Sequence, residues 1–262
     1  MTGLAPSALQ VTETDVTVET PDGLCDAVFV HPAAASHPGV LLWPDAFGLR
    51  WTFREMGKRL AAEGYAVLIP NPFYRSATAP IFGRDHTSQS REERAKVFRE
   101  KLLPLTAALR APGVAERDAL AHIAFLNSQD AVKRTSKMGT AGYCMGGWLT
   151  MRTAAIAPDR IGAAGSFHGA RLVTDGPDSP HLLVPKMKAQ FVIAIAEDDD
   201  QKQSEAKDKL REAFAAANLT AEIEVYAGAM HGWCTRGNPV YNEVQAERAW
   251  TRLLALVKRA LV

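Results

Sequence analysis

The sequence predicts an α/β protein with a mainly parallel sheet, helices on both faces and an antiparallel hairpin at its N-terminal edge. Short apolar runs alternate with segments of helical periodicity along the 262 residues, which is typical of repeated strand–helix units. Residues 11–18 alternate in polarity, and the turn sequence Thr20-Pro21-Asp22-Gly23 follows, as expected of a hairpin. A cysteine between two glycines, Gly142-x-Cys144-x-Gly146, separates an apolar run from a helical segment and indicates a sharp strand-to-helix turn.

The other elements are predicted from the same patterns. Further strands are expected at residues 25–30, 39–43, 65–70, 161–167, 190–196 and 221–226, and in the run before Cys144. Helices are expected at residues 51–63, 90–109, 114–128, 145–155, 204–217 and 243–261. The stretch 71–86 and the Pro-rich stretch 171–187 are expected to be loops, and the first is long enough to cover a functional face.

Composition narrows the class of protein. The sequence has 30 Lys and Arg residues and 29 Asp and Glu residues. This even balance does not indicate binding to nucleic acid or to an anionic membrane surface. Three widely spaced cysteines do not form a disulfide framework, which favours a reducing, cytoplasmic compartment. Residues 1–10 lack the pattern of a signal peptide, and no apolar run is long enough to span a membrane. We expect one domain over residues 1–262, acting as a monomer or small homo-oligomer.

The glycine-bracketed Cys144 has two interpretations. In the catalytic one, the turn exposes the sulfur at the start of a helix, whose dipole and free N–H groups favour the nucleophilic thiolate. In the structural one, Cys144 is a buried cysteine beside a tight turn, since free cysteines are often buried.

The order of reactive side chains along the chain favours the catalytic interpretation. Cys144 follows one expected strand, Asp198, Asp199 and Asp200 follow a later one, and His231 follows the last. Ligands of such sheets bind at the carboxyl ends of the strands, and nucleophile, acid and histidine in this order form a known type of catalytic triad. Taken singly, His231 could be an ordinary loop residue and the acidic run a solvated helix start. All three features in this order predict a triad.

These residues resemble those of the dienelactone hydrolases, which are α/β-hydrolases with a cysteine nucleophile. The resemblance covers nearly the whole chain and is carried by Gly142-Tyr143-Cys144-Met145-Gly146-Gly147, Pro44-Asp45-Ala46-Phe47-Gly48, the acidic strand end and the His231 loop. It implies the α/β-hydrolase fold and hydrolysis of a small ester or lactone, of the carboxymethylenebutenolidase type, through a cysteinyl acyl-enzyme. No metal or organic cofactor is expected.

The resemblance also implies roles for particular residues. Asp199 would be the triad acid because it lies three residues beyond Ala196, with Asp198 as the alternative and Asp200 at the helix start. The backbone N–H groups of Ala46 and Met145 would form the oxyanion hole. At the position of Asp45 the family carries a glutamate that pairs with the resting thiol. The shorter Asp45 either activates the thiol or only shapes the turn before Gly48.

The remaining substrate-binding candidates are less specific. The family holds its substrate's carboxylate with two arginines, for which Arg91 or Arg94 and Arg236 are candidates, although the family's second position is occupied here by Thr235. His168 and Trp233 are candidates for the pocket wall, with a local loop role as the alternative for His168. Two other functions keep the fold: a ligand-binding protein whose thiol is acylated without turnover, and a thiol redox protein that uses Cys144 with Cys234.

Overall fold

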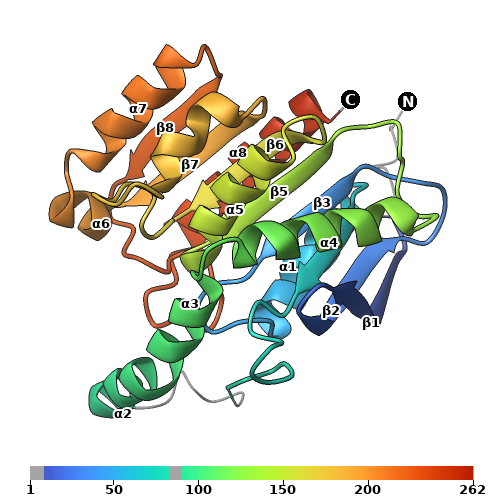
Figure 1. Cartoon of the computed structure of the whole chain (residues 1–262), viewed down its shortest axis with the longest axis horizontal. Coiled ribbons are helices and arrows are strands. Elements are labelled where there is room, and N and C mark those ends of the chain that lie inside the picture. The colour runs from blue at the N-terminus through green and yellow to red at the C-terminus, as the bar shows by residue number, and fades with distance from the viewer. Residues whose placement is uncertain (1–8, 83–89, 262) are drawn as a thin grey trace, which may run out of the picture.

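The structure, a computed structural model, describes residues 9–82 and 90–261, and this part of the chain forms one eight-stranded sheet between two layers of helices (Figure 1). The strand order is β1-β2-β4-β3-β5-β6-β7-β8. Strand β2 pairs antiparallel with β1 and with β4, and the strands from β4 to β8 run parallel. The predicted α/β class, with its antiparallel hairpin at one edge, is therefore confirmed.

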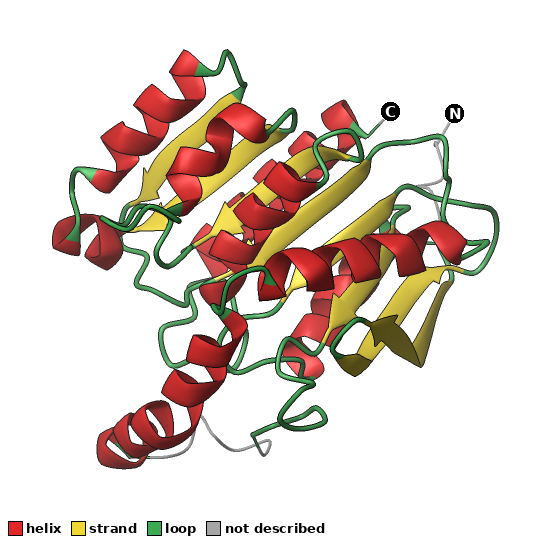
Figure 2. Cartoon of the chain, viewed as in Figure 1, coloured by secondary structure: helices red, strands yellow, loops and turns green. Residues whose placement is uncertain are grey.

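The strands lie where the apolar runs predict them. Their bounds are β1 (Val11–Thr20), β2 (Gly23–Pro32), β3 (Gly39–Trp43), β4 (Ala66–Pro70), β5 (Met138–Tyr143), β6 (Ile161–Phe167), β7 (Gln190–Ala196) and β8 (Ala221–Tyr226). Every residue of β3, β4 and β5 is buried, because helices cover both faces of the central sheet (Figure 2).

The helices divide between the two faces of the sheet. Their bounds are α1 (Trp51–Ala62), α2 (Arg91–Val97), α3 (Leu103–Leu109), α4 (Val114–Ser128), α5 (Met145–Ile156), α6 (Glu197–Lys202), α7 (Ala206–Ala216) and α8 (Glu243–Ala260). Apolar residues of α1 and α8 pack in one core cluster, and those of α4, α5 and α7 pack in another on the opposite face. In Figure 1, α4, α5 and α7 lie in front of the sheet and α1 and α8 lie behind it.

Three segments differ from the sequence-based expectation. The helix expected at 90–109 is divided into α2 and α3 by a π-helical stretch, Phe98–Leu102. The loop expected at 171–187 contains a 3-10 helix, Pro180–Lys186. The acidic residues after β7 form the short helix α6, which has no apolar periodicity to reveal it. Residues 83–86 of the loop expected at 71–86 lie outside the described residues.

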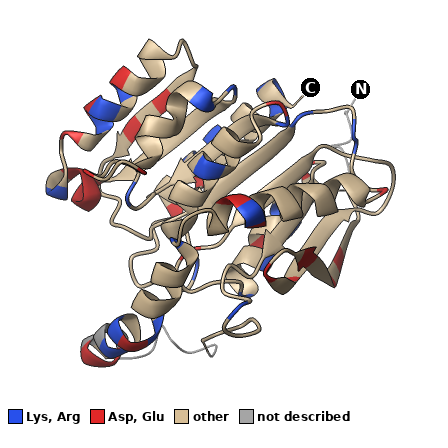
Figure 3. Cartoon of the chain, in the orientation of Figure 1, with Lys and Arg blue, Asp and Glu red and all other residues tan. Residues whose placement is uncertain are grey.

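In Figure 3, acidic and basic residues occur together on α7, α6 is largely acidic, and most of α4 and α5 is uncharged. Within residues 9–82 and 90–261, no helix combines the length and the apolar character needed to cross a bilayer.

Candidate active site

Cys144 occupies the turn between β5 and α5 in a strained backbone conformation. Its φ is +52° and its ψ is −112°, a combination that a non-glycine residue adopts at a cost of about 1–3 kcal/mol. The Cys144 N–H donates to the carbonyl of Phe167 on the neighbouring strand β6, at 3.0 Å, which holds the turn in place. The side chain is partly exposed, unlike those of Cys25 and Cys234, which are buried.

The two glycines that flank Cys144 are required by close packing. A Cβ on Gly142 would collide with the carbonyl oxygen of Gly146, and a Cβ on Gly146 would lie 2.5 Å from the carbonyl oxygen of Trp43. The turn therefore brings the start of α5 against the loop that leaves β3. This contact explains why the sequence has small residues two positions on either side of the cysteine.

His231 lies in the loop after β8 and is held by two carboxylates of α6. Its Nδ1 lies 2.5 Å from Oδ2 of Asp199, and its backbone N–H donates to Oδ1 of Asp198 at 2.7 Å. Asp200 instead accepts from Lys207 at 2.7 Å. The structure thus brings Asp199 to the imidazole and Asp198 to the loop backbone, while Asp200 faces the next helix.

The surroundings of His231 favour its charged form. Burial of the ring lowers its pKa, but the hydrogen bond to Asp199 and the interaction with Cys144 outweigh burial and raise the pKa to about 10. Because Asp199 occupies Nδ1 of His231, the other ring nitrogen, Nε2, is the one that can interact with the Cys144 sulfur. At neutral pH the imidazole is therefore protonated, and Cys144 faces a cation.

The backbone N–H groups expected to form the oxyanion hole belong to two segments that meet at the Cys144 turn. Among the residues that the structure describes, neither the N–H of Met145 nor that of Ala46 donates a hydrogen bond. Met145 opens α5 directly after Cys144, and Ala46 lies in the loop that packs on Gly146 through Trp43 and Pro44. Free donors on both sides of a nucleophile can stabilise an oxyanion.

Asp45 is engaged in a buried ion pair. Its two carboxylate oxygens accept from the two terminal nitrogens of Arg50, at 2.6 and 2.7 Å, and Oδ1 also accepts from the Phe47 N–H at 2.9 Å. The side chains of Arg50 and Asp45 are only 9% and 6% exposed. The Asp45 carbonyl closes the turn by accepting from the Gly48 N–H. These bonds are those of a residue that shapes the turn. Sequence reasoning missed Arg50. The only indication of its role in the sequence is its position, five residues after Asp45.

His168 and Trp233 are buried behind the candidate triad. His168 is 1% exposed and Trp233 has no exposed surface, so neither offers a wall to a substrate as we expected from the sequence. The His168 ring lies edge-on against His231, with centroids 5.1 Å apart, and against Trp233 at the same distance. Both ring nitrogens of His168 are buried without a hydrogen-bond partner in the described part of the chain.

Arg236, one of the arginines expected to bind a carboxylate, does not share a pocket with Cys144 or His231. Arg236 donates to the Tyr241 hydroxyl at 3.3 Å and lines a separate pocket, between α1 and α8, that also contains Cys234. Neither Cys144 nor His231 lines that pocket. Arg91 and Arg94 belong to α2, but their side chains lie outside the described part of the structure. Within the described residues, no group of three or more His, Cys, Asp or Glu side chains could hold a metal ion.

Comparisons with a family model and with known proteins agree on one family. The sequence matches the model of the dienelactone hydrolase family over residues 25–261. A "Putative carboxymethylenebutenolidase" of Salmonella typhi is 28% identical over 272 residues, which cover 96% of this chain and 93% of that protein. One of Escherichia coli strain K12, with the same description, is 28% identical over 277 residues, or 98% of this chain and 95% of its own length.

Solved structures show the same fold. A "Putative Dienelactone Hydrolase" from Klebsiella pneumoniae superposes with a TM-score of 0.78 at 23% identity, covering 95% of this chain and 99% of that one. A dienelactone hydrolase-like promiscuous phosphotriesterase from metagenomic libraries superposes with a TM-score of 0.74 at 21% identity, covering 96% and 99%. The expected α/β-hydrolase fold is therefore confirmed.

Proposed function

The chain belongs to the dienelactone hydrolase family, and from this premise we propose that it hydrolyses a small ester or lactone through a triad of Cys144, His231 and Asp199. The observation that carries the proposal is the contact of His231 Nδ1 with Asp199 at 2.5 Å, in a loop that also presents the imidazole to Cys144. A nucleophile, a base and an orienting carboxylate in contact are the parts that covalent catalysis needs.

The first half of the reaction acylates the cysteine. The Cys144 sulfur attacks the carbonyl carbon, and the carbonyl oxygen becomes an oxyanion that accepts from the N–H groups of Met145 and Ala46. These hydrogen bonds become stronger as negative charge develops on the oxygen. They therefore stabilise the transition state more than the bound substrate and lower the barrier. When the intermediate collapses, the C–O bond breaks and His231 gives its proton to the departing alkoxide. In a lactone, this alkoxide stays attached to the acyl group.

The second half releases the acid. His231, now neutral, takes a proton from water, and the resulting hydroxide attacks the thioester carbon. The C–S bond breaks, the sulfur leaves as thiolate, and the imidazolium is restored beside it. Asp199 stays ionised throughout and keeps the Nδ1 proton in place, so that Nε2 carries the proton that is exchanged.

A substrate assay with a burst measurement tests this proposal. The wild-type protein should turn over 4-nitrophenyl acetate in a steady state, and the Cys144→Ala variant should lose that turnover. A stoichiometric burst without a steady state would favour the ligand-binding alternative, in which the thiol is acylated and not released. Activity retained by Cys144→Ala would refute the cysteine mechanism altogether. Cys234→Ser serves as the matched control, because the redox alternative requires Cys234 and the hydrolase mechanism does not.

A further inference from the structure

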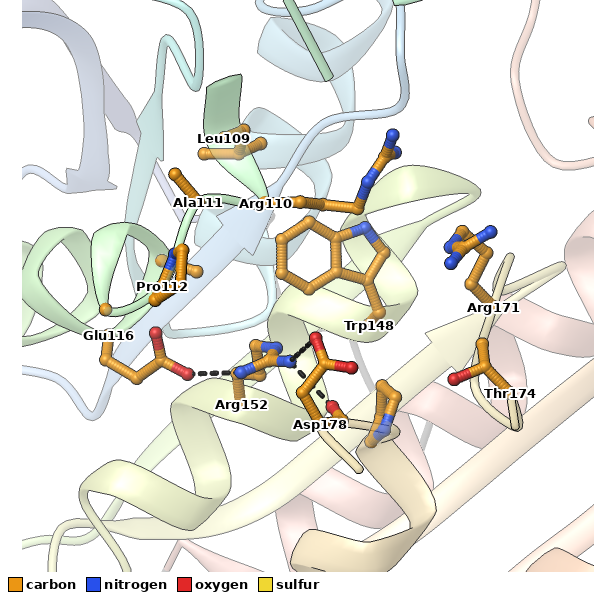
Figure 4. A pocket seen from close by; sticks show the side chains of 13 residues that line it. Leu109, Arg110, Ala111, Pro112, Glu116, Trp148, Arg152, Arg171, Thr174 and Asp178 are labelled. Atoms are coloured by element: carbon orange, nitrogen blue, oxygen red, sulfur yellow. Dashed lines mark hydrogen bonds and ion pairs between the residues drawn. The ribbon is translucent and has the colours of Figure 1, made fainter. Parts of the chain in front are cut away.

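A cavity lies beside the first turns of α5, outside the arrangement described above. It has a volume of about 210 Å³ and is lined by the end of α3, the start of α4, one side of α5 and the loop after β6 (Figure 4). A cavity of about 150 Å³ is enough to hold benzene in a well-studied protein. This cavity is therefore large enough for a small aromatic ring.

Two segments of the chain connect the lining of the cavity to Cys144. Trp148, which lines it, follows Cys144 by four residues, or about one turn of helix. On the other side, the N–H of Ala170 donates to the Cys144 carbonyl at 3.0 Å, and the next residue, Arg171, lines the cavity. The cavity is thus a neighbour of the candidate nucleophile.

The charged side chains of the cavity are three arginines and two carboxylates, which give a formal net charge of +1. Of the three arginines, Arg152 pairs with both carboxylates, Glu116 at 2.5 Å and Asp178 at 3.3 Å, as the dashed lines in Figure 4 show. In the described part of the chain, no hydrogen bond or ion pair joins the guanidinium of Arg110 or Arg171 to another residue. Burial, and then the neighbouring charge of Arg171, lower the pKa of Arg110.

Arg110 and Arg171 line the same cavity, and they lie close enough for the charge of Arg171 to lower the pKa of Arg110. Figure 4 shows Arg110, Arg171 and Trp148 among the side chains that line the cavity. Arg171 also has a φ of +58°, in the left-handed region that non-glycine residues seldom adopt. A carboxylate bound between two neighbouring guanidinium groups reduces their mutual repulsion and forms paired, charge-assisted hydrogen bonds with them.

Part of the lining is apolar. Leu109 and Ala115 are buried, the Trp148 indole is 4% exposed, and Pro112 and Pro180 close the sides. An apolar wall with a few convergent polar groups is the usual form of a small-molecule site. Here the polar groups outside the Arg152 ion pairs are Thr174 and the two arginines, Arg110 and Arg171.

We propose that this cavity binds a small aromatic carboxylic acid, with the carboxylate between Arg110 and Arg171 and the ring against Trp148 and Leu109. The acid could be a free ligand, or it could be the acidic part of the ester that the candidate triad cleaves. Only the second source rests on the proposed function.

Direct titration of the protein with benzoate tests the binding site without relying on catalysis. Benzoate should bind saturably, and neutral benzamide and ring-less acetate should each bind more weakly. Arg110→Gln and Arg171→Gln should each raise the Kd for benzoate about tenfold, the loss expected for one exposed charge-assisted pair. Arg134→Gln is the matched control, because Arg134 is an exposed arginine that lies outside the cavity lining and pairs with Asp130.

The outcomes decide the proposal. An unchanged Kd for benzoate in both cavity variants would overturn it, as would benzamide binding as tightly as benzoate, or no saturable binding at all. Thermal unfolding of each variant should match the wild type, so that a changed Kd reports the site and not the fold.

A kinetic arm identifies the source of the acid. If the substrate supplies it, Arg110→Gln and Arg171→Gln raise KM for the monoanionic ester 4-nitrophenyl hydrogen phthalate and leave KM for 4-nitrophenyl benzoate unchanged. If a free acid supplies it, both esters keep their KM while benzoate affinity falls. Either result supports the site. Loss of all ester turnover in the wild type would contradict the proposed function and leave the benzoate titration to stand by itself.

Discussion

The imidazole of His168 packs edge-on against the imidazole of His231, with ring centroids 5.1 Å apart and an interplanar angle of 65°. Burial, and then the charge of His231, hold the pKa of His168 well below its usual range. His168 is therefore neutral and can support a charged His231 without repelling it. Its backbone is fixed as well, because its N–H donates to the Ala194 carbonyl at 2.8 Å.

This contact predicts that shape, and not hydrogen bonding, is what His168 contributes. Its two ring nitrogens are buried without partners among the described residues, and such groups destabilise a fold by about 1–3 kcal/mol each. His168→Phe should keep the edge-on packing, raise the free energy of unfolding by about 1 kcal/mol and change kcat by less than about threefold. Urea denaturation and steady-state kinetics measure both quantities.

The control for that prediction is His168→Ala. Removing the ring opens a cavity behind His231, which should lower the free energy of unfolding by about 2–4 kcal/mol and lower kcat with it. If His168→Phe lost activity as severely as His168→Ala, the imidazole nitrogens would have a role that packing does not supply.

The two carboxylates of α6 should differ sharply in their effect on activity. Asp199→Asn removes the charge beside Nδ1 and allows the wrong tautomer of His231, so kcat/KM should fall by about 10²-fold or more. Asp198→Asn keeps an oxygen that can accept from the His231 N–H, and its loss should stay below about tenfold. Initial rates with 4-nitrophenyl acetate compare the two variants. A larger loss in Asp198→Asn would transfer the role of triad acid to Asp198.

The buried pair of Asp45 and Arg50 should be sensitive to removal of either partner. Asp45→Ala leaves the guanidinium of Arg50 buried without its carboxylate, and Arg50→Met leaves the carboxylate of Asp45 buried without its guanidinium. Each should lower the free energy of unfolding by about 3–5 kcal/mol. The double variant Asp45→Ala/Arg50→Met carries neither charge and should be more stable than Asp45→Ala alone. Additive losses in this cycle, measured by chemical denaturation, would mean that the two side chains act independently.

Much of the fold could be predicted from the sequence because its strands are continuous apolar runs. The predicted bounds of β3, β6, β7 and β8 agree with the structure, and so do those of α4. The helix α6 could not be predicted, because it has six residues and no apolar face. The distinction between Asp198 and Asp199 depends on how that helix faces the His231 loop, which no local pattern encodes.

Predictions for the surroundings of the triad were weaker because they concern tertiary contacts. Trp233 follows His231 by two residues, which suggested a pocket wall, but its ring turns into the core and stacks on Tyr226. Arg110 and Arg171 are 61 residues apart and belong to different loops, so their approach to one cavity depends on the packing of α3 and α5. Tertiary contacts of this kind can be identified only from the folded structure.

The thiols should react in a pattern that depends on their burial. Cys25 and Cys234 are buried, and desolvation raises the pKa of each thiol above its usual range. Cys144 is partly exposed at the start of α5 and faces His231. Since alkylation requires an accessible thiolate, iodoacetamide should modify Cys144 alone in the native protein and all three cysteines in denaturant. Mass spectrometry of proteolytic peptides identifies the modified sites, and rapid native labelling of Cys234 would contradict this reasoning.

Stability should depend on pH through His231. Because its pKa is raised to about 10 in the folded protein, the native state binds a proton that the unfolded state has lost above its own pKa of about 6.5. The stabilisation is therefore complete below about pH 6.5 and declines as pH rises toward 10. The difference in free energy of unfolding between the wild type and His231→Gln should shrink across this range. Urea denaturation at pH steps from 6 to 10 measures it, and a difference that grew with pH would show that His231 is held neutral in the fold.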